Sequence, residues 1–392
     1  MVNLRPKLVQ SKLSEAQARA VLHTIAFPGF EDQQESLKAT FPAATLSTLS
    51  RLQIHFLLTF PFEALSMNYE PHSSMSSHLR DVYTRFVEQR HGGGYCLQVN
   101  PLYREVLSFL GYRYFGVLGR VFSPISHSWS GLTHTASLVY LDSHLPEEAG
   151  KKVYYLSDVG YGSSPHRPIL LRDGWEEFGR GSVEKFRVVR KALQPQSTFE
   201  PAPAPEATEQ VDEQVESIAG NQAGWILQQS KPSGEWQDCY AFAPLQCFDE
   251  DYHASNKATS HKESVPFATM ILVVRYLLHP DRLPHSAQRL QRDGLQPELY
   301  PYHPSVVEQR MIVGDKYIVK IGDDTEVSRK IESEGERVDL LKREFGLLRH
   351  VSKEEALQTI SGKPSRLKET SETERKQAKT NEINGTDRTS AH

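Results

Sequence analysis

The chain of 392 residues is long enough for two or three domains, at about 150 residues per domain. Its 45 Lys and Arg residues and 49 Asp and Glu residues give a formal net charge of -4, which argues against nucleic-acid binding because that function needs a clustered basic excess. The N-terminal region has no apolar run of signal-peptide type, and no later run is long enough to cross a bilayer. We therefore expect a cytoplasmic protein that binds neither nucleic acid nor membrane.

The first 111 residues are expected to form a helical bundle. Apolar residues recur at helical spacing from about residue 14 to residue 110. The clearest sets are Leu49, Leu52 and Phe56, then Leu79, Val82 and Phe86. Ser14 followed by Gln17 has the pattern of a capping box, which marks the start of a helix.

The pattern changes after Gly111 to short runs rich in Val, Tyr and Phe, separated by turn residues. These runs lie at 112–122, 133–141, 153–159 and 183–189. They predict an antiparallel β-domain over residues 112–235. Within it, residues 193–222 are rich in Pro, Ala, Glu and Gln and poor in aromatic residues, so we expect a disordered insert there.

A third region, residues 236–361, mixes the two patterns and is expected to form a smaller α/β domain. Strands are predicted at 269–277 and 316–321, and helices at 249–256 and 337–345. Residues 362–392 are almost entirely Lys, Glu, Ser, Thr and Asn, which predicts a disordered tail.

Cys96 is the strongest candidate nucleophile. It follows three glycines and Tyr95, and a helical pattern that ends at Gly111 follows it. Because proline is tolerated in the first turn of a helix, Pro101 places the helix start at or just after Cys96. The N-terminus of a helix favours a thiolate, which is the form of cysteine that attacks a carbonyl carbon. A buried structural cysteine after a glycine turn is the alternative.

The other cysteines, Cys239 and Cys247, bring the total to three, which is too few and odd in number for a disulfide framework. A reducing compartment therefore fits the sequence.

A cysteine nucleophile needs a base, and the base needs an acceptor that orients it. His134 begins a predicted strand, although a lone histidine in a strand is more often structural. Asp158 ends the next strand and opens a glycine-rich turn, where a buried carboxylate needs strong donors such as an imidazole. The alternative for Asp158 is a cap on its own turn.

Four motifs in this order resemble the arylamine N-acetyltransferases. They are PFEAL at 61–65, GGYCLQVN at 93–100, SGLTH at 130–134 and DVGYG at 158–162. The resemblance implies a Cys-His-Asp triad of Cys96, His134 and Asp158. It also implies an α+β fold with an N-terminal helical bundle, a central antiparallel β-barrel and a C-terminal α/β lid.

The resemblance further implies transfer of an acetyl or related short acyl group from coenzyme A to an arylamine or hydrazine, by a ping-pong route through an acyl-cysteine, and a role in xenobiotic detoxification. Acyl-CoA is then a co-substrate, and neither a metal nor a tightly bound cofactor is required. The acyl group and the oligomeric state stay open. For a malonyl group, the candidate cations are Arg90, Arg120 and Arg167.

The expected substrate-binding residues lie near the triad motifs and in the segment SNKATSHKESVPF at 255–267, which resembles the part of the family that helps to form the coenzyme A pocket. They are Tyr95, Ser130, Gly131, Tyr161, Ser264 and Phe267. Asn256 and Ser260 match the same coenzyme A segment.

Two positions depart from the family pattern. Gly92 stands where the family has an arginine, which usually pairs with a glutamate that corresponds to Glu63. Arg90 could replace that arginine if the glycine loop bulges. Tyr161 stands where phenylalanine is usual, and its hydroxyl is expected to line the acceptor pocket.

Two other function classes remain open at this stage. A papain-like thiol hydrolase or transglutaminase uses the same Cys-His-Asp logic, but the chain lacks the C-G-[SA]-C-[WY] pattern and its histidine lies much closer to the cysteine. A non-catalytic binding module on the same fold is the second alternative, suggested by Gly92. A covalent acetyl group on Cys96 after incubation with acetyl-CoA would distinguish an enzyme from such a module.

Overall fold

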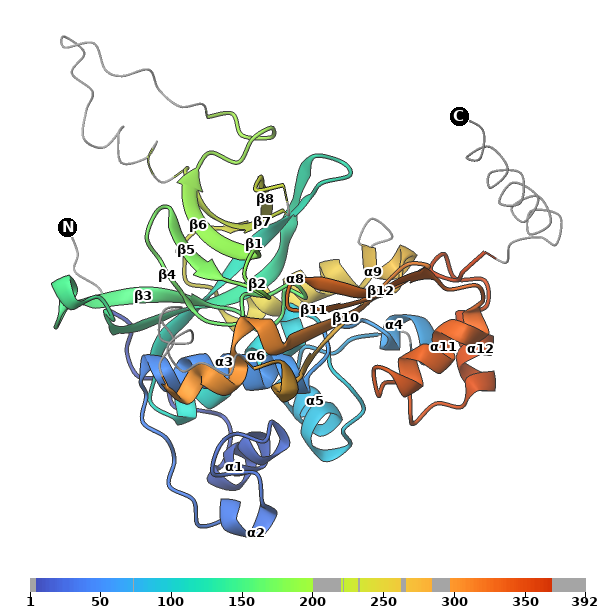
Figure 1. The fold of residues 1–392 in the computed structure, drawn as a ribbon, viewed down its shortest axis with the longest axis horizontal. Helices are drawn as coiled ribbons and strands as arrows, with labels where there is room; N and C mark the ends of the chain where they lie inside the picture. The colour runs from blue at the N-terminus through green and yellow to red at the C-terminus, as the bar shows by residue number, and fades with distance from the viewer. Residues whose placement is uncertain are drawn as a thin grey trace, which may run out of the picture.

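The computed structural model describes residues 5–72, 74–199, 220, 222–231, 233–261, 266–283 and 297–368. Figure 1 shows three parts: a group of helices, a curled eight-stranded sheet above them, and a four-stranded sheet beside a pair of helices. This arrangement confirms the predicted α+β fold of a helical bundle, an antiparallel β-barrel and a C-terminal α/β part.

The N-terminal helices form where the apolar spacing predicts them. They are α1 (Glu15–Thr24), α2 (Gln33–Ser36), α3 (Leu46–Thr59), α4 (Ser66–Tyr69), α5 (Leu79–Tyr83), the π-helical turn η1 (Thr84–Glu88) and α6 (Cys96–Phe109). The predicted capping box is present, since Ser14 Oγ accepts from the N–H of Gln17 and the Gln17 side chain accepts from the N–H of Ser14. Leu49, Leu52 and Phe56 are fully buried in the shared core, as their spacing requires.

Helix α6 begins at Cys96, as predicted, but Pro101 lies in its second turn and not in its first. Since proline lacks an N–H, the carbonyl of Leu97 receives no i+4 hydrogen bond, yet the helix continues to Phe109. Gly111 follows the helix with a φ of 83°, which is the left-handed conformation typical of a helix end.

The eight strands of the barrel run antiparallel in the order β4-β3-β2-β1-β8-β7-β6-β5, and the two edge strands β4 and β5 contact each other, so the sheet is nearly closed. The strands are β1 (Arg113–Ser123), β2 (Ser128–Asp142), β3 (Lys152–Ser157), β4 (Ile169–Leu170), β5 (Trp175–Phe178), β6 (Lys185–Lys191), β7 (Gly224–Ser230) and β8 (Trp236–Phe242). Short 3-10 turns lie at η2 (Pro146–Glu148), η3 (Pro280–Arg282), η4 (Pro297–Tyr302) and η5 (Pro304–Val306).

The barrel extends past the boundary expected at residue 235. Strand β8 pairs with β1 on one side and β7 on the other, so the sheet ends at Phe242. Polar residues interrupt this strand, which hides its apolar pattern. The start of the expected disordered insert is also ordered, because Trp129 Nε1 donates to the carbonyl of Gln194 at 2.9 Å. Residues 200–219 and 221 lie outside the described part.

The second sheet is antiparallel in the order β12-β11-β10-β9, and α11 and α12 share its core. Its elements are α8 (Asp249–His261), α9 (Pro266–Thr269), β9 (Leu272–Leu278), β10 (Val307–Val313), β11 (Lys316–Ile321), β12 (Asp324–Lys330), α11 (Glu334–Arg343) and α12 (Lys353–Ile360). A bridge between Phe62 and Val274 joins this sheet to residues 61–63, a segment that hydrogen-bonds to the glycine loop before Cys96.

The tail predicted to be disordered from Gly362 is ordered as far as Lys368. Ser365 is buried, and its carbonyl accepts a hydrogen bond from Arg337 Nη2 at 2.9 Å. The N–H of Leu367 donates to Glu334 Oε2 at 2.9 Å. These bonds to α11 explain the difference; residues 369–392 lie outside the described part. Among the described helices, none is long and apolar enough to cross a membrane.

Candidate active site

The glycine loop before Cys96 is fixed by a neighbouring backbone segment. The N–H of Gly94 donates to the carbonyl of Pro61 at 3.2 Å, and the N–H of Glu63 donates to the carbonyl of Gly94 at 3.4 Å. A Cβ at Gly93 would lie 1.9 Å from the Pro61 oxygen, so the approach requires glycine. The loop thereby places Cys96 at the first position of α6, at the positive end of the helix.

His134 and Asp158 form a buried pair beside Cys96. His134 Nε2 lies 2.8 Å from Asp158 Oδ2, and the two residues are 2% and 1% exposed. Strands β2 and β3 are neighbours in the barrel, and this brings the two residues together although 24 positions separate them. Cys96 Sγ lies 3.6 Å from the carbonyl of Thr133, the residue before the histidine. The three residues predicted to form the triad therefore lie in one place.

The charges of this cluster support one another. Burial alone lowers the pKa of His134, but the charge of Asp158 and the charge and hydrogen bonding of Cys96 raise it to about 10. Burial raises the pKa of the Asp158 carboxyl, but His134 and the donors Asn100 and Gly160 outweigh it, and that pKa is lowered. A positive imidazolium between a carboxylate and a sulfur is the arrangement that activates a thiol.

Asn100 is a site residue to which sequence reasoning gave no role. Its side-chain nitrogen donates to Asp158 Oδ1 at 2.9 Å and to the carbonyl of Thr135 at 2.8 Å, and it is fully buried. It lies one helical turn after Cys96 on α6, so both face the barrel. The sequence did offer one indication of this role, because a polar residue four positions after the nucleophile lies on the same face of the helix. Asn100 therefore fixes Asp158 Oδ1, while Asp158 Oδ2 contacts His134.

The loop after Asp158 also touches the nucleophile. A Cβ at Gly160 would lie 2.5 Å from Cys96 Cα and 2.8 Å from Asn100 Nδ2. We therefore expect Gly160→Ala to separate the loop from α6 and to lower the acylation rate about 100-fold, because small misplacements of reacting groups have large effects on rate. Single-turnover kinetics with acetyl-CoA measure this rate. Gly335→Ala is the control, since its Cβ meets only ordinary contacts, and an unchanged rate in Gly160→Ala would contradict the tight approach.

The rate of alkylation by iodoacetamide tests whether Cys96 and His134 form an ion pair. The pKa of His134 is raised to about 10, so the imidazolium persists below that pH beside the Cys96 sulfur. At pH 6.5 iodoacetamide should label Cys96 about tenfold faster in the parent than in His134→Asn, and the difference should disappear above pH 10, where the imidazole is neutral. Mass spectrometry locates the label.

Cys239 and Cys247 serve as internal controls for this experiment. Burial raises the pKa of the Cys239 thiol to about 12 and also raises that of Cys247. Both should stay unlabelled at pH 6.5. Equal labelling of Cys96 in the parent and in His134→Asn at that pH would show that the two side chains do not form an ion pair.

The residues expected at the coenzyme A pocket pack around Tyr95, the residue before Cys96. Phe267 stacks on Tyr95 with ring centroids 5.1 Å apart and an angle of 9°. The Tyr95 hydroxyl donates to Asn256 Oδ1 at 2.7 Å, so this buried tyrosine ties α8 to the nucleophile loop. Ser260 on α8 is buried nearby, and Ser264 lies outside the described residues.

Ser130 and Gly131 shape the strand before His134. Ser130 Oγ accepts from the N–H of Val121 at 2.8 Å, next to a register shift between β1 and β2. Gly131 is exposed, and a Cβ there would meet open space. The Ser130 side chain is thus hydrogen-bonded to the backbone at the register shift. Gly131 lies at the surface, three residues before His134.

Comparison with known proteins agrees with this geometry. A protein-family model described as N-acetyltransferase matches residues 45–201. N-malonyltransferase FDB2 of Gibberella moniliformis is 24% identical over 304 residues, which are 75% of this chain and 75% of the relative. Arylamine N-acetyltransferase 2 of Macaca mulatta is 30% identical over 149 residues, which are 37% of this chain and 47% of the relative.

Solved structures share the fold. The arylamine N-acetyltransferase of Nocardia farcinica has a TM-score of 0.63 at 21% identity and covers 91% of this chain and 97% of its own. The enzyme of Mycobacterium marinum in complex with CoA has a TM-score of 0.58 at 20% identity, over 87% of this chain and 97% of its own. The chain is an acyltransferase related to the arylamine N-acetyltransferases.

In this acyltransferase the cation that faces Glu63 is Arg85. Glu63 is fully buried, which raises the pKa of its carboxyl, and the charge of Arg85 opposes that rise. Arg85 Nη2 lies 3.6 Å from Glu63 Oε1, and Arg85 Nη1 lies 3.0 Å from Glu70 Oε1. The suggestion that Arg90 faces Glu63 is therefore wrong. Arg85 comes from η1, and no local pattern in the sequence indicates its pairing with Glu63.

Glycine at position 92 is consistent with the pairing of Glu63 with Arg85. Its φ is 127°, and a Cβ there would lie 2.7 Å from Leu347 Cδ2 and 3.5 Å from Glu63 Oε1. The positive φ and the close approach of Leu347 both disfavour a side chain at position 92, and Arg85 provides the cation that faces Glu63.

The Tyr161 hydroxyl is directed into the barrel wall. Burial, and then the interaction with Cys239, raise the pKa of Tyr161 well above its ordinary value. The ring lies edge-on to His134 at 5.6 Å, and the ring of Tyr240 on β8 lies 4.2 Å from that of His134. Both aromatic rings confine the imidazole, and Tyr240 is a neighbour that the sequence did not reveal.

Proposed function

We propose that this chain transfers a short acyl group from an acyl-CoA to an arylamine or hydrazine through an acyl-enzyme on Cys96. The observation that carries the proposal is the buried His134–Asp158 pair, at 2.8 Å, with the Cys96 sulfur beside the imidazole. The printed names of the relatives, N-malonyltransferase and arylamine N-acetyltransferase, support the same reaction class.

The reaction proceeds in two half-reactions. The Cys96 thiolate attacks the thioester carbonyl, the C–S bond to coenzyme A breaks, and His134 gives its proton to the departing thiolate. The amine then attacks the acyl-cysteine carbonyl, His134 takes the proton of the amine, and the Cys96 thiolate is released with the amide product. Asp158 holds the imidazole in one tautomer and stabilises its positive charge throughout. The residues of this site need no metal or resident cofactor.

The donor in this proposal is an acyl-CoA, and α8 and α9, which carry the two ends of the segment that resembles the coenzyme A segment of the family, pack against the nucleophile loop through Tyr95. The apolar cluster that contains Cys96 favours a short acyl chain, whereas a malonyl carboxylate requires a cation. Phe62, Ala64, Leu118 and Phe267 belong to or pack against this cluster. Among the candidate cations, Arg167 pairs with Glu177 at 2.9 Å, and Arg120 Nη1 donates to the carbonyl of Ser130, on the strand of His134, at 3.1 Å. The reaction fits a cytoplasmic enzyme, where acyl-CoA is available.

Mass spectrometry of the intact protein tests the proposal. Incubation with acetyl-CoA or malonyl-CoA should add one acyl group to Cys96, and subsequent aniline should remove it as the N-acyl product. Comparison of the modification by acetyl-CoA with that by malonyl-CoA also identifies which acyl group the chain transfers. If neither donor modifies Cys96, or if water removes the acyl group as fast as aniline does, the chain is not an N-acyltransferase of this kind.

A further inference from the structure

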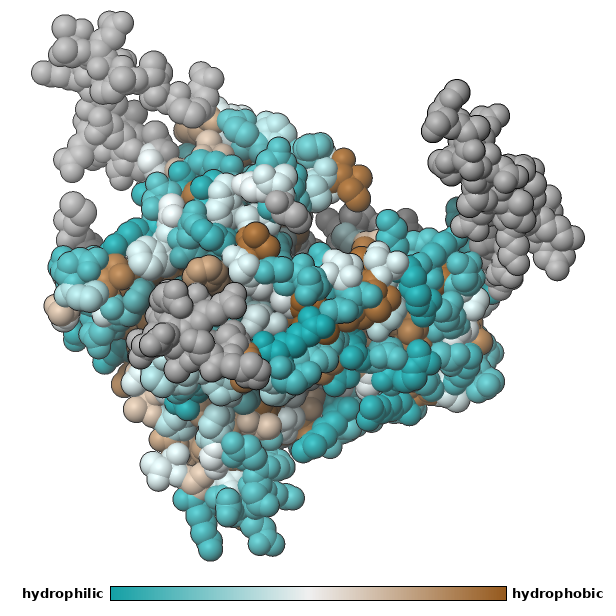
Figure 2. Space-filling model, in the orientation of Figure 1, coloured by the Kyte–Doolittle hydropathy of each residue, from teal (hydrophilic) through white to brown (hydrophobic). Residues whose placement is uncertain are grey.

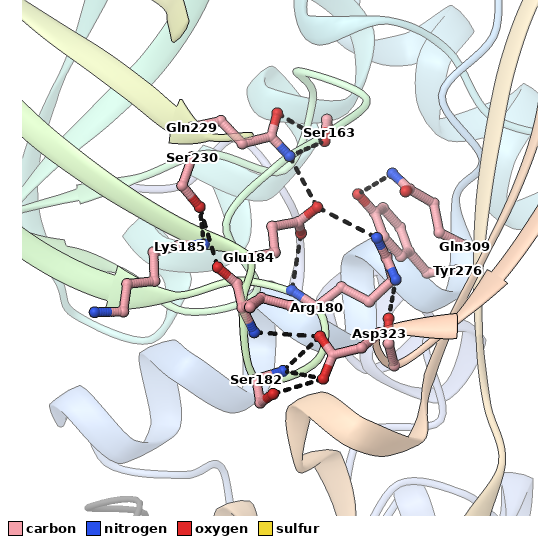
Figure 3. A network of polar contacts seen from close by, with 12 residues as sticks. Ser163, Arg180, Ser182, Glu184, Lys185, Gln229, Ser230, Tyr276, Gln309 and Asp323 are labelled. Atoms are coloured by element: carbon pink, nitrogen blue, oxygen red, sulfur yellow. Dashed lines mark hydrogen bonds and ion pairs between the residues drawn. The ribbon is translucent and has the colours of Figure 1, made fainter. Parts of the chain in front are cut away.

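The loop that carries Asp158 is held at its far end by both sheets. The hydroxyl of Tyr276, on β9, donates to the carbonyl of Gly162 at 2.8 Å, and it accepts from Gln309 Nε2 at 3.1 Å. From the barrel, Gln229 Nε2 donates to Ser163 Oγ at 3.1 Å. Figure 3 shows the contact of Tyr276 with Gln309 and that of Gln229 with Ser163.

The same network joins the two sheets to each other. Glu184 accepts from Gln229 Nε2 at 2.9 Å and from the N–H of Arg180 at 2.8 Å. Arg180 Nη1 donates to the carbonyl of Gly322 in the turn between β11 and β12. In that turn Asp323 accepts from the Ser182 N–H at 2.8 Å and hydroxyl at 2.6 Å, as Figure 3 shows. The second sheet is therefore fixed relative to the barrel.

The loop has little space in which to move. Gly162 has a φ of 92°, and a Cβ there would lie 3.0 Å from the ring of Phe62. Two residues earlier, the N–H of Gly160 donates to Asp158 Oδ1 at 2.8 Å, and Gly160 also touches Cys96. Tyr276 is itself 3% exposed. Without its hydroxyl, the Gly162 carbonyl would lose a buried donor, and a loop shift would be the simplest relief.

We propose that Tyr276 is a positioning residue for the triad: its hydrogen bond to Gly162 holds the Asp158 loop in the place where Asp158 orients His134. This inference rests on the function proposed above. The residues of the second sheet lie outside the three motifs of the triad. According to this inference, Tyr276 of that sheet nevertheless affects the rate of acylation through the Asp158 loop.

Tyr276→Phe tests the role because it removes only the hydroxyl. The acylation rate in single turnovers with acetyl-CoA should fall about tenfold, while the KM for acetyl-CoA should change less than twofold. Alkylation of Cys96 at pH 6.5 should also slow, because a misplaced Asp158 stabilises the imidazolium less. Ser163→Ala, which removes the hold from the barrel side, should give a smaller loss of the same kind and serves as the second variant if Tyr276→Phe folds poorly.

Tyr317→Phe is the matched control. Tyr317 lies on β11 of the same sheet and packs against Phe345, away from the Asp158 loop. It should keep the parental acylation and alkylation rates. Parental rates for both assays in folded Tyr276→Phe would overturn the inference, and so would a loss of stability in urea without a change in rate. The alkylation assay needs no acyl transfer, so its result is independent of whether Cys96 proves to be the nucleophile.

Discussion

Cys96→Ser should abolish acyl transfer and leave the fold intact. A serine hydroxyl is almost the same size as the thiol, so the packing of α6 against the barrel is retained. Its proton is far harder to remove, and His134 with one helix N-terminus provides too little stabilisation for an alkoxide. We expect the rate of N-acylation of aniline to fall to the background rate, a loss of at least about 10⁴-fold.

Cys247→Ser provides the matched control for this variant. Cys247 is half-buried near the start of α8 and should tolerate the change with most of the activity retained. Far-ultraviolet circular dichroism and urea unfolding establish that Cys96→Ser is folded. Turnover near the parental rate in a folded Cys96→Ser would mean that another group is the nucleophile.

Local sequence patterns were sufficient for the parts of the site that depend on neighbouring residues. The glycines before Cys96 predicted a tight loop followed by a helix start, and the capping box at Ser14 predicted the first helix. In both cases the residues that determine the geometry lie within a few positions of it. The runs rich in Val, Tyr and Phe at 133–141 and 153–159 likewise predicted strands β2 and β3.

The unpredicted parts depend on contacts between distant segments. Arg85 reaches Glu63 across two elements, and Tyr276 reaches Gly162 across 114 positions. Neither residue stands in a pattern that marks it as polar, buried and paired. The barrel boundary was misplaced for the same reason, since β8 is recognisable as a barrel strand only through its pairing with β1.

Asp158→Asn should cause the second large loss. Asp158 accepts from His134 Nε2 at 2.8 Å, from Asn100 Nδ2 at 2.9 Å and from the N–H of Gly160 at 2.8 Å. An amide has a single oxygen and cannot accept all three. If its oxygen keeps Asn100 and Gly160, its NH₂ group faces His134 and forces the imidazole into the wrong tautomer. Loss of the negative charge also lowers the pKa of His134 from about 10, so the imidazolium is lost at a lower pH.

Both effects act on the acylation step, so we expect single-turnover acylation to fall about 10³-fold or more at pH 7.5, with a smaller change in the KM for acetyl-CoA. Labelling of Cys96 at pH 6.5 should also be slower than in the parent, because the imidazolium of His134 is less stable without the carboxylate. Asp142→Asn is the control: Asp142 is exposed at the end of β2 and pairs with Lys152 at 2.8 Å. A folded Asp158→Asn with more than about a tenth of the parental acylation rate would show that the carboxylate serves the stability of the loop and not the orientation of the base.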